Sequence, residues 1–381
     1  MKSGVLVIHF GDVAGYPPVL HAIPLIAAAG LPVQVLSCLS ASDFAPKFPS
    51  DFPARLHFCK AMPSGWRKLL HWLVFIVKAC NLALWQRPKW VYASDALALP
   101  AAQAARFFGA SKFVYQEHDS PEATQGKQPW QRQLIARLRA RVLKTADVVV
   151  MPNEDRLRIA RRQVGPGRGE DLVIWNVAPL SELQDKRLDQ LGKSLLVHFH
   201  GSMGPGRVPL ALIDAIAKVP NTIFQFASYE FGGRAHTLAL LERARLLDIA
   251  ERVIDLGSIE DREQLLALTR RSDVGLAFFS NSAQDINHYY MAGASNKVFD
   301  YMSAGLSLLL SNGAQWQAYV PEFGIAVDPN DADSIASALQ SWHERHPDAR
   351  FQGERGRQKI ALDWHFEKCY QPLLRVLCAA R

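Results

Sequence analysis

A glycine-rich segment, HGSMGPGR (200–207), contains the first residues suited to chemistry. It follows an apolar run, SLLVHFH (194–200), and precedes a helical pattern. A strand, a glycine-rich turn and a helix start leave free backbone N–H groups that bind phosphate well. We expect Gly201, Ser202 and Arg207 to contact such an anion, and the Arg207 guanidinium adds a fixed set of donors. The alternative is an ordinary βα turn without a ligand, because the segment matches neither the dinucleotide nor the P-loop pattern.

A second segment, ASNKVFDYMSAG (294–305), predicts a short helix. Ser295 is typical of an N-cap, and the closing glycine is typical of a helix end. Asn296 and Asp300 share one helix face through their i, i+4 spacing, and Asp300 could accept hydrogen bonds from the paired hydroxyls of a ribose. Lys297 lies in the first turn, where a cation is unfavourable unless an anion binds there.

The third candidate is the segment YQEHDSPE (115–122), which follows a predicted strand. Glu117, His118 and Asp119 would stand at the carboxyl end of that strand, where parallel sheets place ligands. We predict these three as catalytic residues, with His118 first, because an imidazole can accept a proton or hold a hydroxyl or a phosphate. The alternative is a polar turn without chemistry.

The elements that must position these residues alternate along the whole chain. Short apolar runs separated by helical patterns predict parallel sheets and an α/β fold class. The predicted strands are 5–10, 32–39, 90–94, 112–117 and 147–152, then 194–200, 222–228, 252–257, 274–279 and 306–311. The series restarts after a polar stretch. We therefore predict two Rossmann-like domains, 1–180 and 194–355, a linker at 181–193 and a C-terminal helix at 356–381.

These motifs, in this order, resemble the GT-B nucleotide-sugar glycosyltransferases, near family 4 and its relatives. The similarity covers most of the chain: a strand ends in His118-Asp119, a Gly-Ser turn opens the second domain, and 296–305 is similar to the donor-site pattern NK-x-x-E-Y-M-x-A-G. The resemblance implies a GT-B fold, in which two parallel-sheet domains face each other across a cleft and a C-terminal helix crosses back to the first domain. It implies that the second domain holds a nucleoside-diphosphate sugar through Gly201, Ser202, Arg207, Ser295, Asn296, Lys297 and Asp300. The first domain would bind a saccharide or lipid-linked acceptor.

The sequence also departs from the family pattern. The usual ribose-binding Glu is Asp300, and the position of a paired carboxylate, eight residues upstream, is Ala292. This loss leaves retention or inversion at the sugar open. We favour a hexosyltransferase in the synthesis of a cell-surface polysaccharide or glycoconjugate. A nucleotide-sugar 2-epimerase-like enzyme and a catalytically degenerate nucleotide-binding partner subunit remain alternatives.

Charge and apolar patterning bear on partners and location. Residues 1–190 carry 24 Lys and Arg against 15 Asp and Glu, whereas 191–381 carry 19 against 21. The basic half indicates an anionic partner, and the apolar segment 69–85 and the basic segment 132–144 are its candidate contacts. We predict a core helix and a surface helix there, with an anionic membrane surface as the alternative. The predicted location is the cytoplasm, with peripheral attachment to the inner face of the membrane as the alternative. No nucleic-acid partner is expected.

The metal-ligating residue types are scattered. Five cysteines occur without C-x-x-C spacing, which argues against a zinc site and fits a reducing compartment. Asp331 and Asp333 are predicted to cap a helix. We therefore expect no metal and no other cofactor, and the charge of the diphosphate would be met by Arg207, Lys297 and helix N–H groups.

Overall fold

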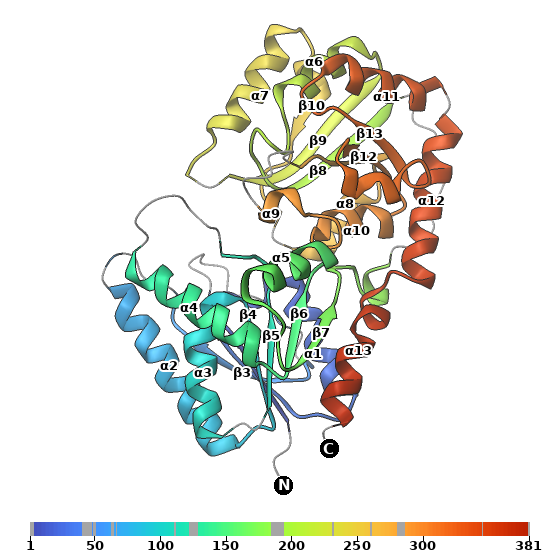
Figure 1. Ribbon diagram of the computed structural model, residues 1–381. Helices are drawn as coiled ribbons and strands as arrows, with labels where there is room; N and C mark the ends of the chain where they lie inside the picture. The colour runs from blue at the N-terminus through green and yellow to red at the C-terminus, as the bar shows by residue number, and fades with distance from the viewer. Residues whose placement is uncertain are drawn as a thin grey trace. The chain divides into compact units, whose positions relative to one another are not determined.

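The computed structural model describes residues 4–39, 48, 51–61, 65, 67–109, 112–121, 129–183, 194–230, 232–259, 261–279, 286–344 and 346–379. The chain forms two compact units (Figure 1): unit 1 is Met1–Asn176 with Phe366–Arg381, and unit 2 is Val177–His365. The predicted C-terminal helix is two helices, α12 (His346–Leu362) and α13 (Phe366–Ala379), and only α13 belongs to unit 1. The helix that returns to the first domain is thus shorter than predicted. Most of the predicted linker lies outside the described residues.

Unit 1 is built on a parallel sheet of seven strands in the order β3-β2-β1-β4-β5-β6-β7. Its strands are β1 (Val5–His9), β2 (Val33–Cys38), β3 (Arg55–Cys59), β4 (Trp90–Ser94), β5 (Lys112–Gln116), β6 (Val148–Met151) and β7 (Glu170–Val173). The five inner strands are the predicted apolar runs. The edge strands β3 and β7 were not predicted from the sequence, because RLHFC and EDLV are half-exposed and lack an apolar run.

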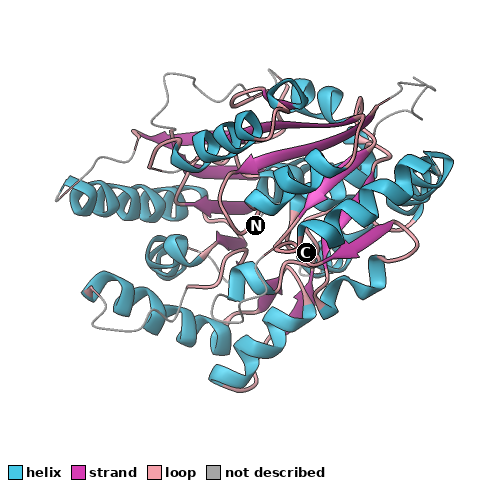
Figure 2. Ribbon diagram, turned by 90° about the horizontal axis from the view of Figure 1, so that it is seen from above, coloured by secondary structure: helices cyan, strands magenta, loops and turns pink. Residues whose placement is uncertain are grey.

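Helices cover both faces of this sheet (Figure 2). One face carries α2 (Arg67–Gln86), α3 (Leu99–Phe108), α4 (Trp130–Thr145) and α5 (Glu154–Val164), which share a core with Leu6 and Ile8 of β1. The opposite face carries α1 (Pro17–Ala28) and α13, which contact each other. There the indole N–H of Trp90 donates to the Leu377 carbonyl over 3.2 Å. This bond fixes α13 on the sheet of unit 1.

Unit 2 has a parallel sheet of six strands in the order β10-β9-β8-β11-β12-β13. Its strands are β8 (Leu195–Ser202), β9 (Thr222–Tyr229), β10 (Val253–Asp255), β11 (Val274–Ala277), β12 (Ser307–Ser311) and β13 (Gly324–Val327). One face packs against α6 (Leu210–Lys218), α7 (Ala235–Leu246) and α11 (Ala332–Glu344). The other face carries α8 (Arg262–Thr269), α10 (Asn296–Ser303) and α12. Both predicted Rossmann-like sheets are therefore present.

Candidate active site

The glycine-rich turn of unit 2 begins where β8 ends. Gly201 has a φ of +111°, a backbone conformation that residues with a Cβ rarely adopt. A Cβ at Gly201 would stand 3.7 Å from the Cε and Nζ atoms of Lys297, so the turn lies beside the first turn of α10. Arg207 closes the turn, and its Nη1 donates to the carbonyl of Ser202 over 3.2 Å. Three of the predicted phosphate contacts therefore belong to one turn, and this turn borders Lys297.

The helix α10 is fixed by its contact with β8 and β11. The backbone N–H of His200 donates to the hydroxyl of Tyr301 over 3.1 Å. The ring of Tyr301 packs so closely on Gly275 that a Cβ there would lie 2.3 Å from it. The helix ends before Gly305, whose φ is +75°, and Ser295 precedes it without making a side-chain capping bond. The predicted extent of the helix is confirmed, and no capping bond from Ser295 occupies the N–H groups of its first turn.

The side-chain ammonium group of Lys297 is buried at the first turn of α10. Its Nζ has no hydrogen-bond partner among the described residues, and it lies 4.1 Å from the ring centre of Phe199. Burial lowers the pKa of Lys297 well below its ordinary value, and the positive charge of Arg207 lowers it further. A buried cation without a counterion is costly, and an anion at this position would remove that cost. Asn296 lies next to it, half-buried, at the start of α10.

Asp300, one turn further along α10, is already engaged. Its side chain is buried; Nη2 of Arg262 donates to Oδ1 over 2.8 Å, and Nε2 of His200 lies 3.2 Å from Oδ2. Arg262 also donates to both oxygens of Glu182, over 2.5 and 2.7 Å. Burial would raise the pKa of Asp300, but Arg262 and His200 hold it below its ordinary value. A ribose hydroxyl would have to share a carboxylate that these two side chains occupy.

In unit 1, the predicted catalytic turn follows β5 and is anchored by Asp95. The Oδ1 atom of Asp95 accepts the backbone N–H groups of His118 (2.8 Å) and Asp119 (3.3 Å). Its Oδ2 atom accepts the hydroxyl of Tyr16 over 2.6 Å. Asp95 itself has a φ of +67°, which is uncommon for a residue with a side chain. Backbone strain of this kind gathers at functional sites, where surrounding contacts hold it in place.

The imidazole of His118 is buried. It is 4% exposed and meets the ring of Tyr16 edge-on, with 5.0 Å between the ring centres. Burial lowers the pKa of His118 to about 4, although Asp119 and Asn176 oppose this in part. Nη1 of the buried Arg156 donates to the His118 carbonyl and fixes the turn from the other side. The imidazole is therefore neutral near pH 7 and can accept a hydrogen bond.

The two carboxylates of the turn differ in exposure. Glu117 is 1% exposed, and its oxygens accept two bonds from Arg139 (2.5 and 2.7 Å), one from Tyr115 (2.6 Å) and one from Ser120 (2.7 Å). These four bonds occupy the carboxylate and tie the turn to α4. The side chain of Asp119 is 77% exposed. Of the three predicted catalytic residues, Asp119 alone has an exposed side chain, whereas the side chains of His118 and Glu117 are buried.

Comparison with known proteins relates this geometry to a family. Residues 19–176 match the model of the glycosyl transferase 4-like domain. Unit 1 carries a glycosyl transferase 4-like domain. No curated protein matches the chain significantly.

Solved structures match the glycosyl transferase 4-like domain and unit 2 together. HepE from Anabaena, in complex with UDP-glucose, is 17% identical with a TM-score of 0.73, and the match covers 99% of this chain and 100% of HepE. Sucrose-phosphate synthase from Thermosynechococcus elongatus is 16% identical (TM-score 0.71, 100% of both chains covered). A glycosyltransferase from Rickettsia africae is 11% identical (TM-score 0.74, 100% of this chain and 98% of that one covered). These neighbours have the GT-B fold, so the expected resemblance and fold class are confirmed.

Sequence reasoning misses several residues that hold the site together. In the glycosyl transferase 4-like domain, Asp95 and Arg156 follow β4 and β6, the two strands that flank β5. Parallel sheets place ligands at the carboxyl ends of their strands, and this rule predicted the turn after β5. The same rule applies to the ends of β4 and β6, so it could have predicted both residues. In unit 2, Arg262 pairs with Glu182, which lies 80 positions away in the sequence, and no local sequence pattern predicts this pair.

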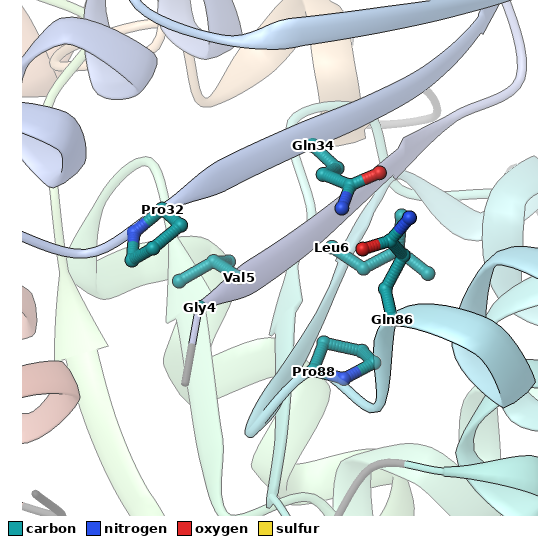
Figure 3. Close-up of a pocket in the computed structure, with 7 residues that line it drawn as sticks. All are labelled: Gly4, Val5, Leu6, Pro32, Gln34, Gln86 and Pro88. Atoms are coloured by element: carbon teal, nitrogen blue, oxygen red, sulfur yellow. The ribbon is translucent and has the colours of Figure 1, made fainter. Parts of the chain in front are cut away.

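The described residues also bear on the metal expectation and contain a separate pocket. Across the described ranges, no group of three or more His, Cys, Asp and Glu side chains is placed to hold a metal ion. Oδ1 of Asp331 accepts the backbone N–H of Asp333 over 2.9 Å at the start of α11, as the capping prediction expects. A pocket of about 200 Å³ opens beside Gln34 and Gln86, at the amino ends of β1 and β2 (Figure 3). None of the described residues that line this pocket is charged, so these residues do not suit a diphosphate.

Proposed function

We propose that the chain is a glycosyltransferase that takes a sugar from a nucleoside-diphosphate sugar and transfers it to a saccharide or lipid-linked acceptor. Unit 2 would bind the donor and unit 1 the acceptor. The observation that carries the proposal is the buried ammonium of Lys297, which has no partner among the described residues and lies beside the glycine turn and Arg207. The glycosyl transferase 4-like domain in residues 19–176 supports it.

The chemistry depends on stabilising the leaving group. When the bond from the anomeric carbon to the diphosphate breaks, negative charge grows on the diphosphate and the sugar becomes oxocarbenium-like. Fixed positive groups aimed at that charge lower the barrier. In this proposal Lys297, Arg207 and the uncapped N–H groups of α10 supply them, in place of a metal ion. We also propose that the product is a cell-surface polysaccharide or glycoconjugate.

On the acceptor side, we assign His118 to the reacting hydroxyl. Because its imidazole is neutral near pH 7, it can accept a hydrogen bond from that hydroxyl and orient it. A pKa of about 4 makes His118 a weak base, so orientation contributes more than proton removal. Asp119, whose side chain is exposed, is the second candidate for the proton if the reaction inverts.

The proposal is tested by donor binding followed by turnover. HepE has been solved with UDP-glucose, so UDP-glucose is the first donor to test, with other nucleotide sugars beside it. A bound donor should raise the melting temperature of the protein by mass action. Incubation with an oligosaccharide or polyprenyl-phosphate sugar should then yield a glycosylated product and free nucleoside diphosphate. Epimerised sugar without any acceptor would support the epimerase alternative. Binding without turnover on any acceptor would support the partner subunit, and no binding would refute a donor site.

A further inference from the structure

The helix α2 exposes most of its apolar side chains. It is 20 residues long and, by length and composition alone, is apolar enough to cross a membrane, yet only 22% of its most apolar window is buried. Its buried side chains are small in number: Phe75, Ala79 and Ala83. Its exposed large apolar residues, each from 40% to 80% exposed, are Leu69, Leu70, Leu73, Val74, Val77, Leu84 and Trp85. A single soluble domain rarely leaves so long an apolar strip in water.

Polar residues of α2 hold this helix flat against unit 1. Nζ of Lys78 donates to the carbonyl of Phe58 over 2.9 Å, and Nε2 of His71 lies 2.8 Å from the carbonyl of Lys60. These bonds fix the inner edge of α2 to β3 and to the residue after it. A helix that spanned a bilayer would have to break them. The apolar strip is therefore placed to lie along a surface instead of crossing it.

The strip continues onto α3. Phe107 is 95% exposed and Phe108 is 53% exposed at the end of α3. A Cβ at Gly109 would stand 2.2 Å from the carbonyl oxygen of Ala83, so the end of α3 touches the last turn of α2. Trp85, on that last turn, is 80% exposed. Three exposed aromatic rings thus come from two helix ends that are in contact.

The helix α4 adds basic charge. Trp130 and Leu134 are exposed at its start, and Arg137, Arg141 and Lys144 follow them at helical spacing, also exposed. α3 packs against both α2 and α4, so the three helices form a continuous layer on one face of the sheet (Figure 1). Together they contain nine Lys and Arg residues and no Asp or Glu. We call the exposed side chains of α2, α3 and α4 the acid-free face.

We infer that the acid-free face docks unit 1 on the surface of an anionic lipid bilayer. Exposed leucine, valine and aromatic side chains would enter the headgroup region, while lysine and arginine would pair with lipid phosphates. A second copy of this chain is a poor occupant, because a symmetric contact would press one acid-free face against another and bring like charges together. Docking would hold the protein peripherally and bring a lipid-linked acceptor within reach of unit 1, but it does not depend on the proposed catalytic activity.

The test is flotation of the full chain with lipid vesicles. Vesicles of phosphatidylcholine mixed with phosphatidylglycerol should carry the protein, those of phosphatidylcholine alone should carry much less, and added salt should release it. The variant Leu70→Gln/Val74→Gln/Val77→Gln removes exposed apolar contacts. The variant Arg137→Gln/Arg141→Gln/Lys144→Gln removes three charges and should weaken partition roughly 100–200-fold. All six positions are exposed, so both variants should fold, which thermal melting checks.

Matched controls come from unit 2. Leu246→Gln changes a leucine that is 71% exposed on α7, and Lys218→Gln/Arg234→Gln/Arg245→Gln removes three exposed charges. Both control variants should float like the wild type. Equal loss in the controls, or no flotation at any salt concentration, would overturn the inference. So would a wild-type dimer that Leu70→Gln/Val74→Gln/Val77→Gln converts to a monomer, since a second copy would then cover the face. Donor binding, measured separately, shows whether the proposed function fails independently.

Discussion

Replacing Lys297 with Met should separate diphosphate recognition from nucleoside recognition. The substitution keeps an unbranched, apolar side chain over the ring of Phe199 and removes the buried ammonium. Because that ammonium has no hydrogen-bond partner in the described part of the chain, Lys297→Met breaks no hydrogen bond there and removes only the contact of the ammonium with the ring of Phe199. The variant should be at least as stable as the wild type, because burying an uncompensated charge is costly.

The size of the effect follows from the lost contact. A hydrogen bond to a charged group contributes about 1.5–3 kcal/mol, which corresponds to roughly 10- to 150-fold in affinity. Lys297→Met should therefore weaken the binding of UDP by that factor and should leave the binding of uridine almost unchanged. An anion would also restore the lowered pKa of Lys297 toward its ordinary value. Binding of UDP should then take up protons when the buffer pH exceeds the pKa of Lys297 in the free protein. The affinity for UDP should fall as the pH rises from that pKa toward the higher pKa of Lys297 in the complex.

Isothermal titration calorimetry measures both effects. Titrations of UDP in buffers of different ionisation enthalpy give the number of protons taken up, and Lys297→Met should abolish the uptake. Lys218→Met is the matched control, because Lys218 is a half-exposed lysine of the same unit. If Lys297→Met binds UDP as tightly as the wild type, or if uridine weakens as much as UDP, Lys297 does not contact the diphosphate.

Three further predictions concern the other site residues. His118→Ala should lower kcat, measured at saturating donor, far more than it weakens UDP binding; the reverse pattern would make His118 a donor-binding residue. Glu117→Gln should cost about 3 kcal/mol of unfolding free energy, because Arg139 loses a buried partner; a large loss of kcat at unchanged stability would instead support Glu117 as a base. Asp300 has a lowered pKa, so its stabilisation should be complete above about pH 4 and should fade as pH falls below that value. Asp300→Asn should lower the melting temperature at pH 7 and flatten its decline below pH 4; parallel curves for the two proteins would refute the Arg262 pairing.

Most elements of the fold can be predicted from local sequence patterns. Inner strands such as β1 and β8 are buried on both faces, so they appear as apolar runs that a sequence reveals. The edge strand β3 has partly exposed residues, and its sequence does not differ from a loop. The structure divides the two units after His365, whereas the sequence placed that boundary after residue 355, because α12 and α13 follow each other closely and only their packing assigns them to different units.

The candidate site was predictable where one segment supplies its residues. The pattern after β8 and the one at α10 each predicted positions that the structure brings together at Gly201 and Lys297. The partners of those positions come from distant segments. Arg262, which occupies Asp300, lies 38 positions away, and Asp95, which anchors the catalytic turn, lies 23 positions from His118. Such partners follow from strand order, and strand order is a property of the folded chain.

The two charges of α10 show how this long-range pairing shapes the site. Lys297 and Asp300 are three positions apart, a spacing at which opposite charges on a helix attract each other. Asp300 instead receives hydrogen bonds from Arg262 and His200, while the Nζ of Lys297 keeps no hydrogen-bond partner within the described residues. Arg262 thus takes up the carboxylate that would otherwise be available to neutralise the lysine. The amine at the start of α10 therefore lacks a hydrogen-bond partner, and a diphosphate has the negative charge and the oxygen acceptors to hold it in its protonated form.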